Sequence, residues 1–460
     1  MKTFKMGGVH PEENKISNDA AIQAIPVGAQ MVVLMNQHLG APATPVVQKG
    51  DKVKVGQLIG EAQAFMCANV HSPVSGTVLK VEPVKDAFGL LKPAVHITVE
   101  GDEWLETIDR TPDIKRECTL EPAAIVAKLK EMGIVGLGGA TFPAHIKYSV
   151  PEGKKAEYLI INAAECEPYL TSDYRVMMEH AEEVCIGISI LRKALGVPNA
   201  YVGIESNKPQ AIAHMQEVAR QFEGIVIEPL KVKYPQGAEK QLINAVTGRR
   251  VPSGKLPIDV GCVVSNLGTT FAVYEAIQKN KPLIENILTV TGKRLPSQHN
   301  CLVRIGTTYN EIIRHTIGEL PATTGKVISG GTMMGKAVVN LDAPTVKGNS
   351  SVLVMDEGEA RRAPETACIR CGKCADACPM GLEPFLLKRL YKAGDLDGLE
   401  QNAAQDCIEC GCCLYSCPAH IPLLDHIRQA KGQVMGVIRA RAAAAKAAAE
   451  AAKAAAEAKK

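Results

Sequence analysis

Hydrophobic and polar positions alternate over short distances in the first hundred residues. Further along the chain, several segments have the longer hydrophobic period of helices. Between residues 50 and 82, short apolar stretches are separated by Gly, Asp and Pro, which is typical of a small β module. Residues 122–132 have the apolar spacing of a helix, and residues 158–162 form an apolar run typical of a strand. Residues 385–393 again have a helical pattern. These patterns predict an α/β protein of several domains.

The final segment, from residue 439 to 460, is rich in alanine and carries charged residues at helical spacing: Lys446, Glu450, Lys453 and Glu457. It predicts a helix of roughly 30 Å at 1.5 Å per residue. The segment lacks the large apolar face that an interfacial membrane helix needs, so we expect a solvated tail and not an anchor.

The composition is that of a soluble globular protein. Of the 460 residues, 46% are hydrophobic and 22% are charged, and 52 basic residues nearly balance 49 acidic ones. The net charge of +3 gives no reason to expect nucleic acid or an anionic membrane surface as the main partner. No apolar run approaches the roughly 18 residues of a membrane-spanning helix, and the N-terminus has no apolar signal core. The 15 cysteines are therefore not expected to form disulfides.

Nine of the cysteines lie between residues 368 and 417, in two copies of C-x2-C-x2-C-x3-C-P displaced by 39 residues. Three cysteines at this spacing surround three irons of a cubane cluster, and the fourth, before proline, ligates the other cluster. Zinc sites also use C-x2-C pairs, but they need neither this cadence nor the proline. The repeat predicts two [4Fe-4S] clusters, cluster I on Cys368, Cys371, Cys374 and Cys417, and cluster II on Cys407, Cys410, Cys413 and Cys378.

The helical pattern between the two motifs distinguishes this module from compact bacterial ferredoxins, which have strands there. The module looks like the α-helical two-cluster ferredoxins inside larger oxidoreductases, which pass single electrons along a short path. Cys412 is extra to the pattern, and we expect it to have no ligand role.

The early β module resembles the two halves of a biotinyl/lipoyl-type barrel-sandwich domain. Its tip, residues 65–69, reads Phe-Met-Cys-Ala-Asn and lacks the lysine that such carriers modify. A structural or docking role is therefore favoured over a covalent carrier.

A glycine loop follows the predicted helix, with glycines at 136, 138 and 139, and Lys147 lies beyond it. The loop is not the dinucleotide fingerprint, because Thr141 stands at the third glycine position and a helix precedes the loop. Its backbone amides are still free to approach a phosphate or a flat ring closely. A tight turn with a surface lysine is the alternative.

Two carboxylates, Glu165 and Glu167, follow the strand at 158–162, where α/β sheets place ligands. A solvated strand exit is the alternative. Cys166 lies between them without a local histidine to activate it, so we expect a small packed residue and not a nucleophile. The other lone cysteines are interpreted in the same way: Cys67, Cys118, Cys185, Cys262 and Cys301.

Three phrases together resemble the flavin- and NADH-binding subunit of respiratory complex I: residues 136–147, 162–168 and 236–239. When the phrases at 5–11 and 37–42 and the ferredoxin repeat are added, the chain is more similar to the C subunits of the Rnf electron-transport complex. This resemblance runs from about residue 4 to about residue 430.

The resemblance implies five parts: a barrel-sandwich domain (1–108), a Rossmann-like α/β FMN/NADH domain (109–283), a small SLBB β-grasp-like domain (284–360), the ferredoxin domain (361–432) and the helical tail (433–460). It implies non-covalent FMN at Gly136, Gly138, Gly139, Lys147, Asn162, Glu165, Asn266 and Thr269. NAD(H) would meet Phe142, Glu167 and Glu239, with Glu167 as the catalytic contact. Three positions depart from the complex I pattern, which leaves the nucleotide contacts less defined: Ala164, Ala238 and Gly268.

The implied function is that of an electron-transfer subunit in a membrane-bound, ion-translocating ferredoxin:NAD+ oxidoreductase. FMN would exchange hydride with NAD(H) and pass single electrons to the two clusters. The implied partners are other subunits of the complex, including a ferredoxin-like iron–sulfur subunit, at the cytoplasmic face of the inner membrane. Two alternatives remain: a corrin reductase of propanediol-using microcompartments, and an electron-relay adaptor without an active flavin site.

Overall fold

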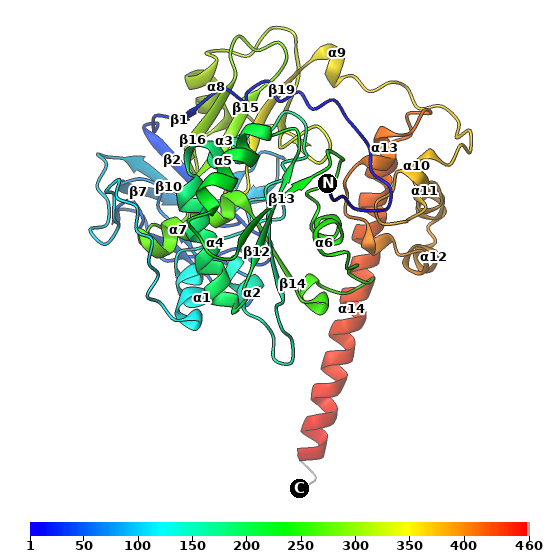
Figure 1. The fold of residues 1–460 in the computed structure, drawn as a ribbon, viewed down its shortest axis with the longest axis horizontal. Coiled ribbons are helices and arrows are strands. Elements are labelled where there is room, and N and C mark those ends of the chain that lie inside the picture. The colour runs from blue at the N-terminus through cyan, green and yellow to red at the C-terminus, as the bar shows by residue number, and fades with distance from the viewer. Residues whose placement is uncertain (458–460) are drawn as a thin grey trace.

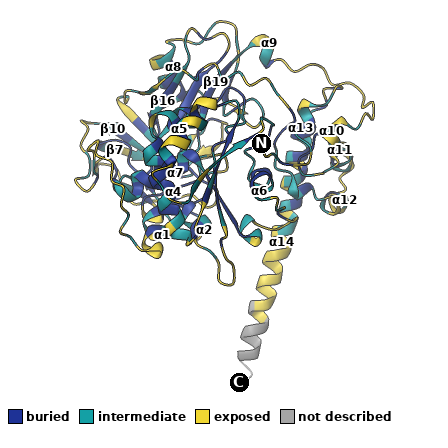
Figure 2. Ribbon diagram, viewed as in Figure 1, coloured by how far each residue is buried: buried dark blue, intermediate teal, exposed yellow. Residues whose placement is uncertain are grey.

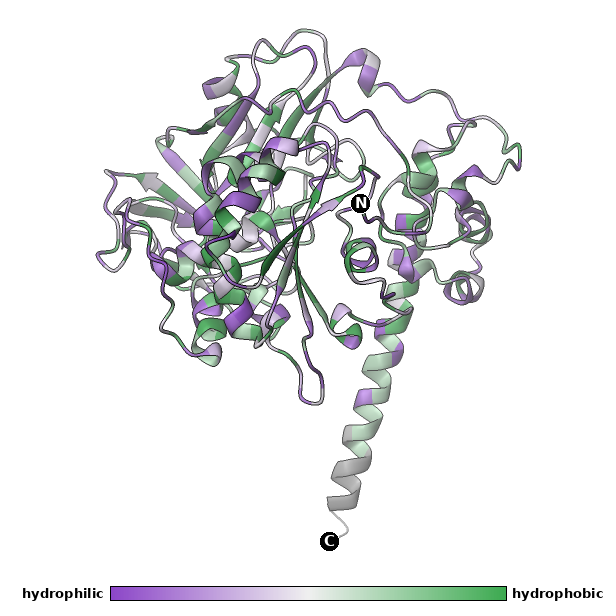
Figure 3. Ribbon diagram, in the orientation of Figure 1, coloured by the Kyte–Doolittle hydropathy of each residue, from purple (hydrophilic) through white to green (hydrophobic). Residues whose placement is uncertain are grey.

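A four-stranded parallel sheet lies at the centre of the computed structural model, which describes residues 1–457 (Figure 1). Its strands, in sheet order, are β13 (Ile225–Leu230), β12 (Ala200–Glu205), β11 (Tyr158–Asn162) and β14 (Cys262–Asn266). The strands consist largely of hydrophobic residues, as Figure 3 shows, because helices cover both faces of the sheet. The predicted strand at 158–162 is confirmed as β11.

Alternate residues of β11 enter two different cores. Leu159 and Ile161 pack with most of the helices of this domain, whereas Ile160 packs on the opposite face with α6 (Glu239–Thr247). The remaining helices are α1 (Pro122–Glu131), which confirms the predicted helix, α2 (Ala144–Tyr148), α3 (Ser172–Glu179), α4 (Ala181–Leu195), α5 (Pro209–Ala219), the 3₁₀ turn Pro257–Val260 and α7 (Leu267–Gln278).

The N-terminal β module contains two facing sheets around a common core. One sheet consists of β2 (Gln30–Leu34), β10 (Ala94–Val99), β7 (Gly76–Val81) and β4 (Lys52–Val53). The other consists of β3 (Thr44–Pro45), β5 (Leu58–Glu61) and β6 (Val70–His71), and a ribbon of β8 (Val84–Lys85) and β9 (Leu91–Lys92) extends from the module.

The third unit is a six-stranded mixed sheet. Its order is β1 (Ile22–Ala24), β16 (His299–Arg304), β15 (Glu285–Thr291), β19 (Ser351–Asp356), β17 (Thr324–Ser329) and β18 (Lys336–Ala337), with α8 (Tyr309–Thr316) and α9 (Glu357–Ala360). Strand β1 pairs with β16 although the predicted boundaries placed it in the 1–108 domain. This pairing is a long-range contact between the segment 1–108 and the mixed sheet unit.

The cysteine-rich module is helical, and the described residues after β19 contain no strand. Its helices are α10 (Lys373–Asp376), α11 (Pro384–Ala393), α12 (Leu396–Gln401), the 3₁₀ turn Ala404–Asp406, α13 (Cys412–Tyr415) and α14 (Leu423–Glu457). Within residues 1–457, no helix is both long and apolar enough to cross a membrane.

The predicted boundary at residue 432 falls inside this module and is corrected by the packing of α14. Val434 is 1% exposed in the module core, Ile438 packs against that core, and the Arg441 guanidinium donates to the Glu400 carboxylate over 2.7 Å. Residues 442–449 of the helix are exposed, as Figure 2 shows. The folded module therefore ends near Arg441, and residues 458–460 of the predicted tail lie outside the described part of the chain.

Two truncations distinguish these boundaries. Ending the chain after Arg441 should leave the visible absorption of both clusters and the thermal unfolding midpoint unchanged. Ending it after Gly432 removes Val434 and Ile438 from the core and should cost roughly 2–3 kcal/mol of stability, because buried aliphatic side chains lose their apolar contacts. Equal unfolding midpoints for the two truncated proteins would contradict the corrected boundary.

Candidate functional site

The glycine loop lies at the carboxyl end of the central sheet, beside the N-terminus of α7. The Leu137 N–H donates to the Thr269 hydroxyl over 2.8 Å, and Asn266 caps α7 by accepting from the Thr269 N–H over 3.1 Å. A Cβ at position 138 would lie 2.9 Å from the Asn266 Cβ, which is closer than side chains pack. The loop backbone therefore lies directly against the cap of α7.

Lys147 and Asn162 connect this loop to the segment 236–239. The Lys147 ammonium contacts the Glu239 carboxylate at 2.8 Å and the Val264 carbonyl at 3.0 Å. The Asn162 amide donates to the Gly237 carbonyl over 2.7 Å. The structure thus brings together residues from four separate stretches of sequence.

The residues around the glycine loop fit a phosphate-bearing flat cofactor. At Gly139, where φ is +139°, a Cβ would meet no heavy atom within 4 Å, so open space lies beside the loop backbone. The cap of α7, a twelve-residue helix, places backbone amides and the positive end of a helix dipole at the same place. Lys147 adds a positive charge, which is paired with Glu239 in this structure. A bound phosphate could replace Glu239 as the partner of Lys147. Flavin phosphate and ring are the expected occupants of such a cradle.

Glu165 has a structural role at this edge of the sheet. Its carboxylate accepts the backbone N–H of Asp173 over 2.7 Å and that of Tyr174 over 3.3 Å, at the start of α3. Asp173 in turn accepts from the Asn266 amide over 2.9 Å. Burial, followed by the neighbouring Glu165 carboxylate, raises the pKa of Asp173 to about 7. Asp173 was not predicted from the sequence, and its carboxyl group lies close to Gly268, one of the positions that depart from the complex I pattern.

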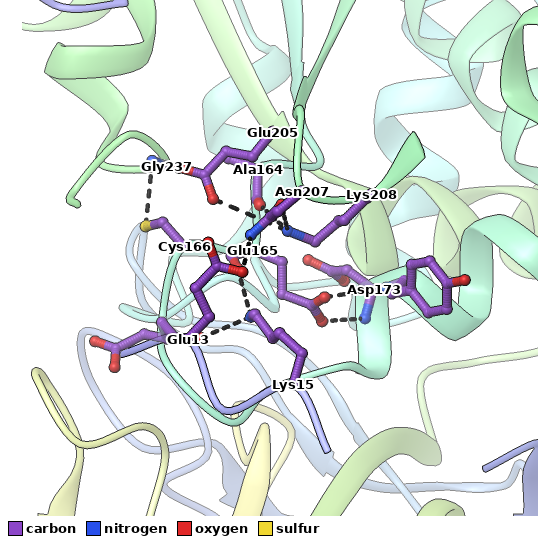
Figure 4. Close-up of polar contacts among 12 residues, drawn as sticks. Glu13, Lys15, Ala164, Glu165, Cys166, Asp173, Glu205, Asn207, Lys208 and Gly237 are labelled. Atoms are coloured by element: carbon purple, nitrogen blue, oxygen red, sulfur yellow. Dashed lines mark hydrogen bonds and ion pairs between the residues drawn. The ribbon is translucent and has the colours of Figure 1, made fainter. Parts of the chain in front are cut away.

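A polar cluster behind the strand exit also escaped prediction from the sequence (Figure 4). The Lys15 ammonium donates to the carbonyl oxygens of Glu165, Glu167 and Leu170 over 2.7–2.8 Å. Lys208, which is 4% exposed, donates to the Ala164 carbonyl over 2.8 Å. These two lysines hold the backbone of the strand exit from two sides. Isolated lysines carry no sequence signal for such a role.

Burial controls the protonation of the groups around this cluster. It raises the pKa of Glu205 to about 7 and, together with the nearby Lys208 charge, lowers the pKa of Lys15 to about 8. Burial also raises the pKa of the Cys166 thiol, whose sulfur accepts the Gly237 N–H over 3.3 Å. Cys166 is therefore a neutral thiol at physiological pH, as expected for a residue that is not a nucleophile.

Glu167 contacts the mixed sheet unit and lies close to the iron–sulfur module. One of its carboxyl oxygens accepts the Met333 N–H over 3.1 Å, and the other lies 3.2 Å from the Tyr234 hydroxyl. That hydroxyl also lies 2.8 Å from the Cys410 carbonyl, and it can donate its single proton to only one of these two acceptors at a time. Both contacts are hydrogen bonds at once when the Glu167 carboxyl is protonated. Burial raises the pKa of Glu167 to about 7, in agreement with this arrangement.

We expect Glu167→Gln to stabilise the protein at high pH. The ordinary pKa of 4.5 is raised to about 7 on folding, so the stability contributed by this carboxyl falls as the pH rises between these values. Glutamine keeps both hydrogen bonds without a proton to lose. At pH 8 the variant should be more stable by about 1–2 kcal/mol, and at pH 5 the two proteins should be nearly equal.

Thermal unfolding at the two pH values measures this difference, with the exposed Glu106→Gln as the control. A Glu167→Gln protein that instead shows a raised KM for NADH and an unchanged pH profile would place Glu167 at the nucleotide, as the resemblance implies.

The cysteines of cluster II converge from both motifs. Cys378, Cys407, Cys410 and Cys413 line a single cavity. Cys374 of the first motif lies close enough to Cys417 of the second for their charges to interact. The cysteines expected at cluster II are therefore grouped across the two motifs, and for cluster I one crossed pair is close, so the crossed ligand assignment stays a prediction.

The backbone of the two motifs is also duplicated. Arg370 and Gly372 flank Cys371 with φ of +55° and +76°, and Glu409 and Gly411 flank Cys410 with φ of +59° and +80°. Such left-handed positions make a loop curl around its ligand and are strained for non-glycine residues, which is typical of functional sites. The cysteine sets fit iron–sulfur clusters in chemistry and in loop geometry.

The two cluster sites differ in exposure. Cys378, Cys410 and Cys413 of the cluster II set are buried, whereas Cys368 and Cys371 of the cluster I set are exposed. The N-terminal segment covers the inner site, because the Gly8 N–H donates to the Ala377 carbonyl over 2.9 Å. Gly7, with φ of +62°, lies so close that a Cβ would be 2.5 Å from the Cys378 carbonyl carbon. The phrase at residues 5–11 therefore docks the ferredoxin module on the central domain.

Three known families match separate parts of the chain. Residues 2–103 match the RnfC barrel sandwich hybrid domain, residues 129–275 the Nuo51 FMN-binding domain, and residues 361–418 the 4Fe-4S dicluster domain. A crystal structure of NAD+-reducing [NiFe]-hydrogenase in the H2-reduced state is similar with a TM-score of 0.49 and 19% identity, over 68% of this chain and 63% of that chain.

Two relatives match nearly the whole chain. The C subunit of the proton-translocating ferredoxin:NAD(+) oxidoreductase complex of Clostridium ljungdahlii is 45% identical over 395 residues, which cover 85% of this chain and 84% of that protein. The C subunit of the Na(+)-translocating complex of Acetobacterium woodii is 42% identical over 437 residues, 94% of this chain and 97% of that protein. The chain therefore belongs to the family of C subunits of ion-translocating ferredoxin:NAD(+) oxidoreductase complexes.

Proposed function

We propose that this protein is the NADH-, FMN- and iron–sulfur-dependent electron-transfer subunit of an ion-translocating ferredoxin:NAD+ oxidoreductase complex. One observation carries the proposal: one strand exit bonds at Asn162 to the segment 236–239, whose Glu239 pairs with Lys147, and contacts the cluster II module through Glu167 five residues later. The Glu167–Tyr234–Cys410 contacts form that second connection. A flavin site and a cluster site that share one loop suit short-range electron transfer.

The residues of the cradle would hold FMN by its phosphate and its ring. Bound FMN supplies the conversion between a hydride pair and single electrons. Lys147, the loop amides and the start of α7 would neutralise the phosphate, and Asn162 and Asn266 would orient the group through their amides. Phe142, whose carbonyl accepts the Gly136 N–H, and Glu239, which pairs with Lys147, are proposed to meet NAD(H). Glu167 would maintain the contact between the strand exit and the cluster II module.

Electrons would leave the chain at the exposed cluster I. Cys368 and Cys371 lie in a segment, residues 361–371, that is exposed throughout and contains Arg361, Arg362 and Arg370. A basic, exposed ligand loop suits an acidic one-electron partner, and we propose an iron–sulfur subunit of the same complex. Peripheral attachment at the cytoplasmic face of the membrane would follow from contacts with such subunits.

Residues 284–360 are proposed to be an SLBB β-grasp-like domain. The hairpin β15–β16 precedes α8, and the last strand β19 pairs in parallel with β15 in the middle of the sheet. That order supports a β-grasp arrangement.

Flavin content and NADH-driven reduction by the purified, cluster-reconstituted protein test the proposal. We expect one FMN per chain, NADH-dependent ferricyanide reduction and reduction of a protein one-electron acceptor. Cys371→Ala should retain the ferricyanide reaction at the flavin and lose reduction of the protein acceptor. A protein that binds no FMN and oxidises no NADH would be a relay adaptor, and the proposal would fail.

A further inference from the structure

The glycine loop is held at its beginning by a lysine from another domain. The Lys347 ammonium donates to the Gly133 carbonyl over 2.7 Å and to the Asn69 carbonyl of the barrel tip over 2.7 Å. Gly133 lies against that tip, since a Cβ there would be 2.3 Å from the Asn69 carbonyl oxygen. Lys347 therefore connects the barrel, the mixed sheet unit and the first residue of the loop.

The end of the loop is held by the same two units. The Leu39 N–H donates to the Thr141 carbonyl over 3.2 Å. Gly348 lies under Thr141, because a Cβ at position 348 would be 2.1 Å from the Thr141 methyl carbon and 3.6 Å or more from its other neighbours. Thr141 itself has a φ of +50°, so surrounding contacts must maintain its conformation.

Residues 37–40 of the barrel domain contact both Lys347 and the barrel tip. The Gln37 side-chain carbonyl accepts the Lys347 N–H over 3.2 Å, and the His38 ring accepts the Ala68 N–H over 3.1 Å. Gly40 has a φ of +112°, and a Cβ there would be 2.1 Å from the Met66 carbonyl oxygen. The segment 37–40 and the barrel tip are therefore in direct contact. Neither segment is part of a proposed cofactor site, so these contacts suggest a structural role for both.

Burying the Lys347 ammonium costs desolvation free energy, which an apolar side chain at this position would not. It is 1% exposed, and within residues 1–457 its ammonium has two carbonyl acceptors and no carboxylate partner. Burial lowers its pKa to about 7. An apolar residue of similar length would avoid the desolvation penalty, but it would leave the Asn69 and Gly133 carbonyls without this donor.

We propose that the barrel tip, the phrase 37–40 and residues 347–348 form a clamp that holds the loop 133–141 in its FMN-binding conformation, with Lys347 as the positioning residue. The inference rests on the proposed FMN site. A loop with glycines at 136, 138 and 139 has many alternative conformations, and ordering them on binding costs affinity. Fixing both ends in advance removes part of that cost.

Two variants with a matched rescue test the clamp. Gly348→Ala should push Thr141 away and weaken FMN binding about tenfold, and adding Thr141→Ser removes the clashing methyl and should restore it. Lys347→Met leaves two buried carbonyls without a donor and should weaken FMN binding by a similar factor. Lys326→Met is the control, because Lys326 bonds the Ala360 carbonyl in the same sheet unit away from the loop.

FMN titration by fluorescence quenching measures these affinities, and cluster absorption checks the fold. Saturating FMN should restore NADH-driven ferricyanide reduction to the clamp variants, since only affinity has changed. Wild-type FMN affinity in both Gly348→Ala and Lys347→Met, with affinity lost in Gly138→Val, would overturn the clamp and leave the proposed site intact. Full FMN binding in Gly138→Val as well would overturn the proposed site. Failure of Thr141→Ser to rescue Gly348→Ala, or of saturating FMN to restore activity, would overturn the clamp as a positioning device.

Discussion

Replacing Cys378 by alanine should remove the cluster associated with the second cysteine motif and spare the cluster of its own motif. The iron content should fall from about eight to about four per chain. Cys378 shares a cavity with Cys407, Cys410 and Cys413, so its loss leaves cluster II with three thiolates. Cluster I depends on Cys417 for its fourth ligand and should form normally.

Electron paramagnetic resonance of the reduced protein separates the two outcomes, with Cys371→Ala as a reference for the loss of cluster I. Cys412→Ala is the matched control: this cysteine lines the same cavity but falls outside the repeated pattern. It should keep both signals and about eight irons. A Cys378→Ala spectrum that matches Cys371→Ala, with the second-motif signal intact, would contradict the crossed assignment.

Loss of cluster II should also interrupt the chain between NADH and the outer cluster. NADH-driven reduction of a protein acceptor should fall to background in Cys378→Ala, because Cys410 and its neighbours are the cysteines in contact with the strand exit through Tyr234. Ferricyanide reduction at the flavin should persist.

The elements predicted from the sequence are those with a strong local pattern. Strand β11, helix α1 and helix α11 follow from periodicity within ten residues or so, because their buried faces are set by the backbone repeat. The cluster type could likewise be predicted from the cysteine repeat, since ligand spacing determines how a loop surrounds a cluster.

The features that escaped prediction depend on contacts between distant segments. Strand β1 is three residues long and is defined only by its partner β16. Lys15, Lys208 and Lys347 are indistinguishable in sequence from surface lysines, and their contacts are with segments far away in the sequence. Glu167 was expected at the nucleotide, and only the fold reveals its contacts with Met333 and Tyr234.

Partial success at the flavin cradle has the same origin. The resemblance implied Lys147, Asn162 and Asn266 at FMN and Glu239 at NAD(H), and in the structure Lys147 pairs with Glu239 while Asn162 bonds the Gly237 carbonyl. The sequence alone could not predict that Lys147 and Glu239 pair with each other, or that Asp173 lies beside Asn266. Such pairings depend on side-chain directions that only the assembled sheet determines.

Gly138→Val should abolish FMN binding while both clusters remain. A Cβ at this position would lie 2.9 Å from the Asn266 Cβ and 3.2 Å from its Cγ, so the loop must move away from the cap of α7. That movement breaks the Leu137–Thr269 hydrogen bond and displaces the amides that are proposed to meet the phosphate. We expect FMN affinity to fall at least a hundredfold, about 3 kcal/mol, from the loss of several backbone contacts together.

Gly136→Ala is the matched control in the same loop, because its Cβ would meet only the Phe142 backbone at 3.7 Å or more, which is ordinary contact. It should bind FMN within about threefold of the wild-type protein, since no backbone contact has to move. Flavin fluorescence of the released cofactor and NADH-driven ferricyanide reduction measure both variants, and the visible absorption of the clusters confirms that the fold persists. Because Gly136 and Gly138 lie two residues apart in one loop, a difference between them reports the approach to Asn266 and not loop flexibility. Full flavin content and full NADH oxidation in Gly138→Val would place the cofactor elsewhere in the molecule.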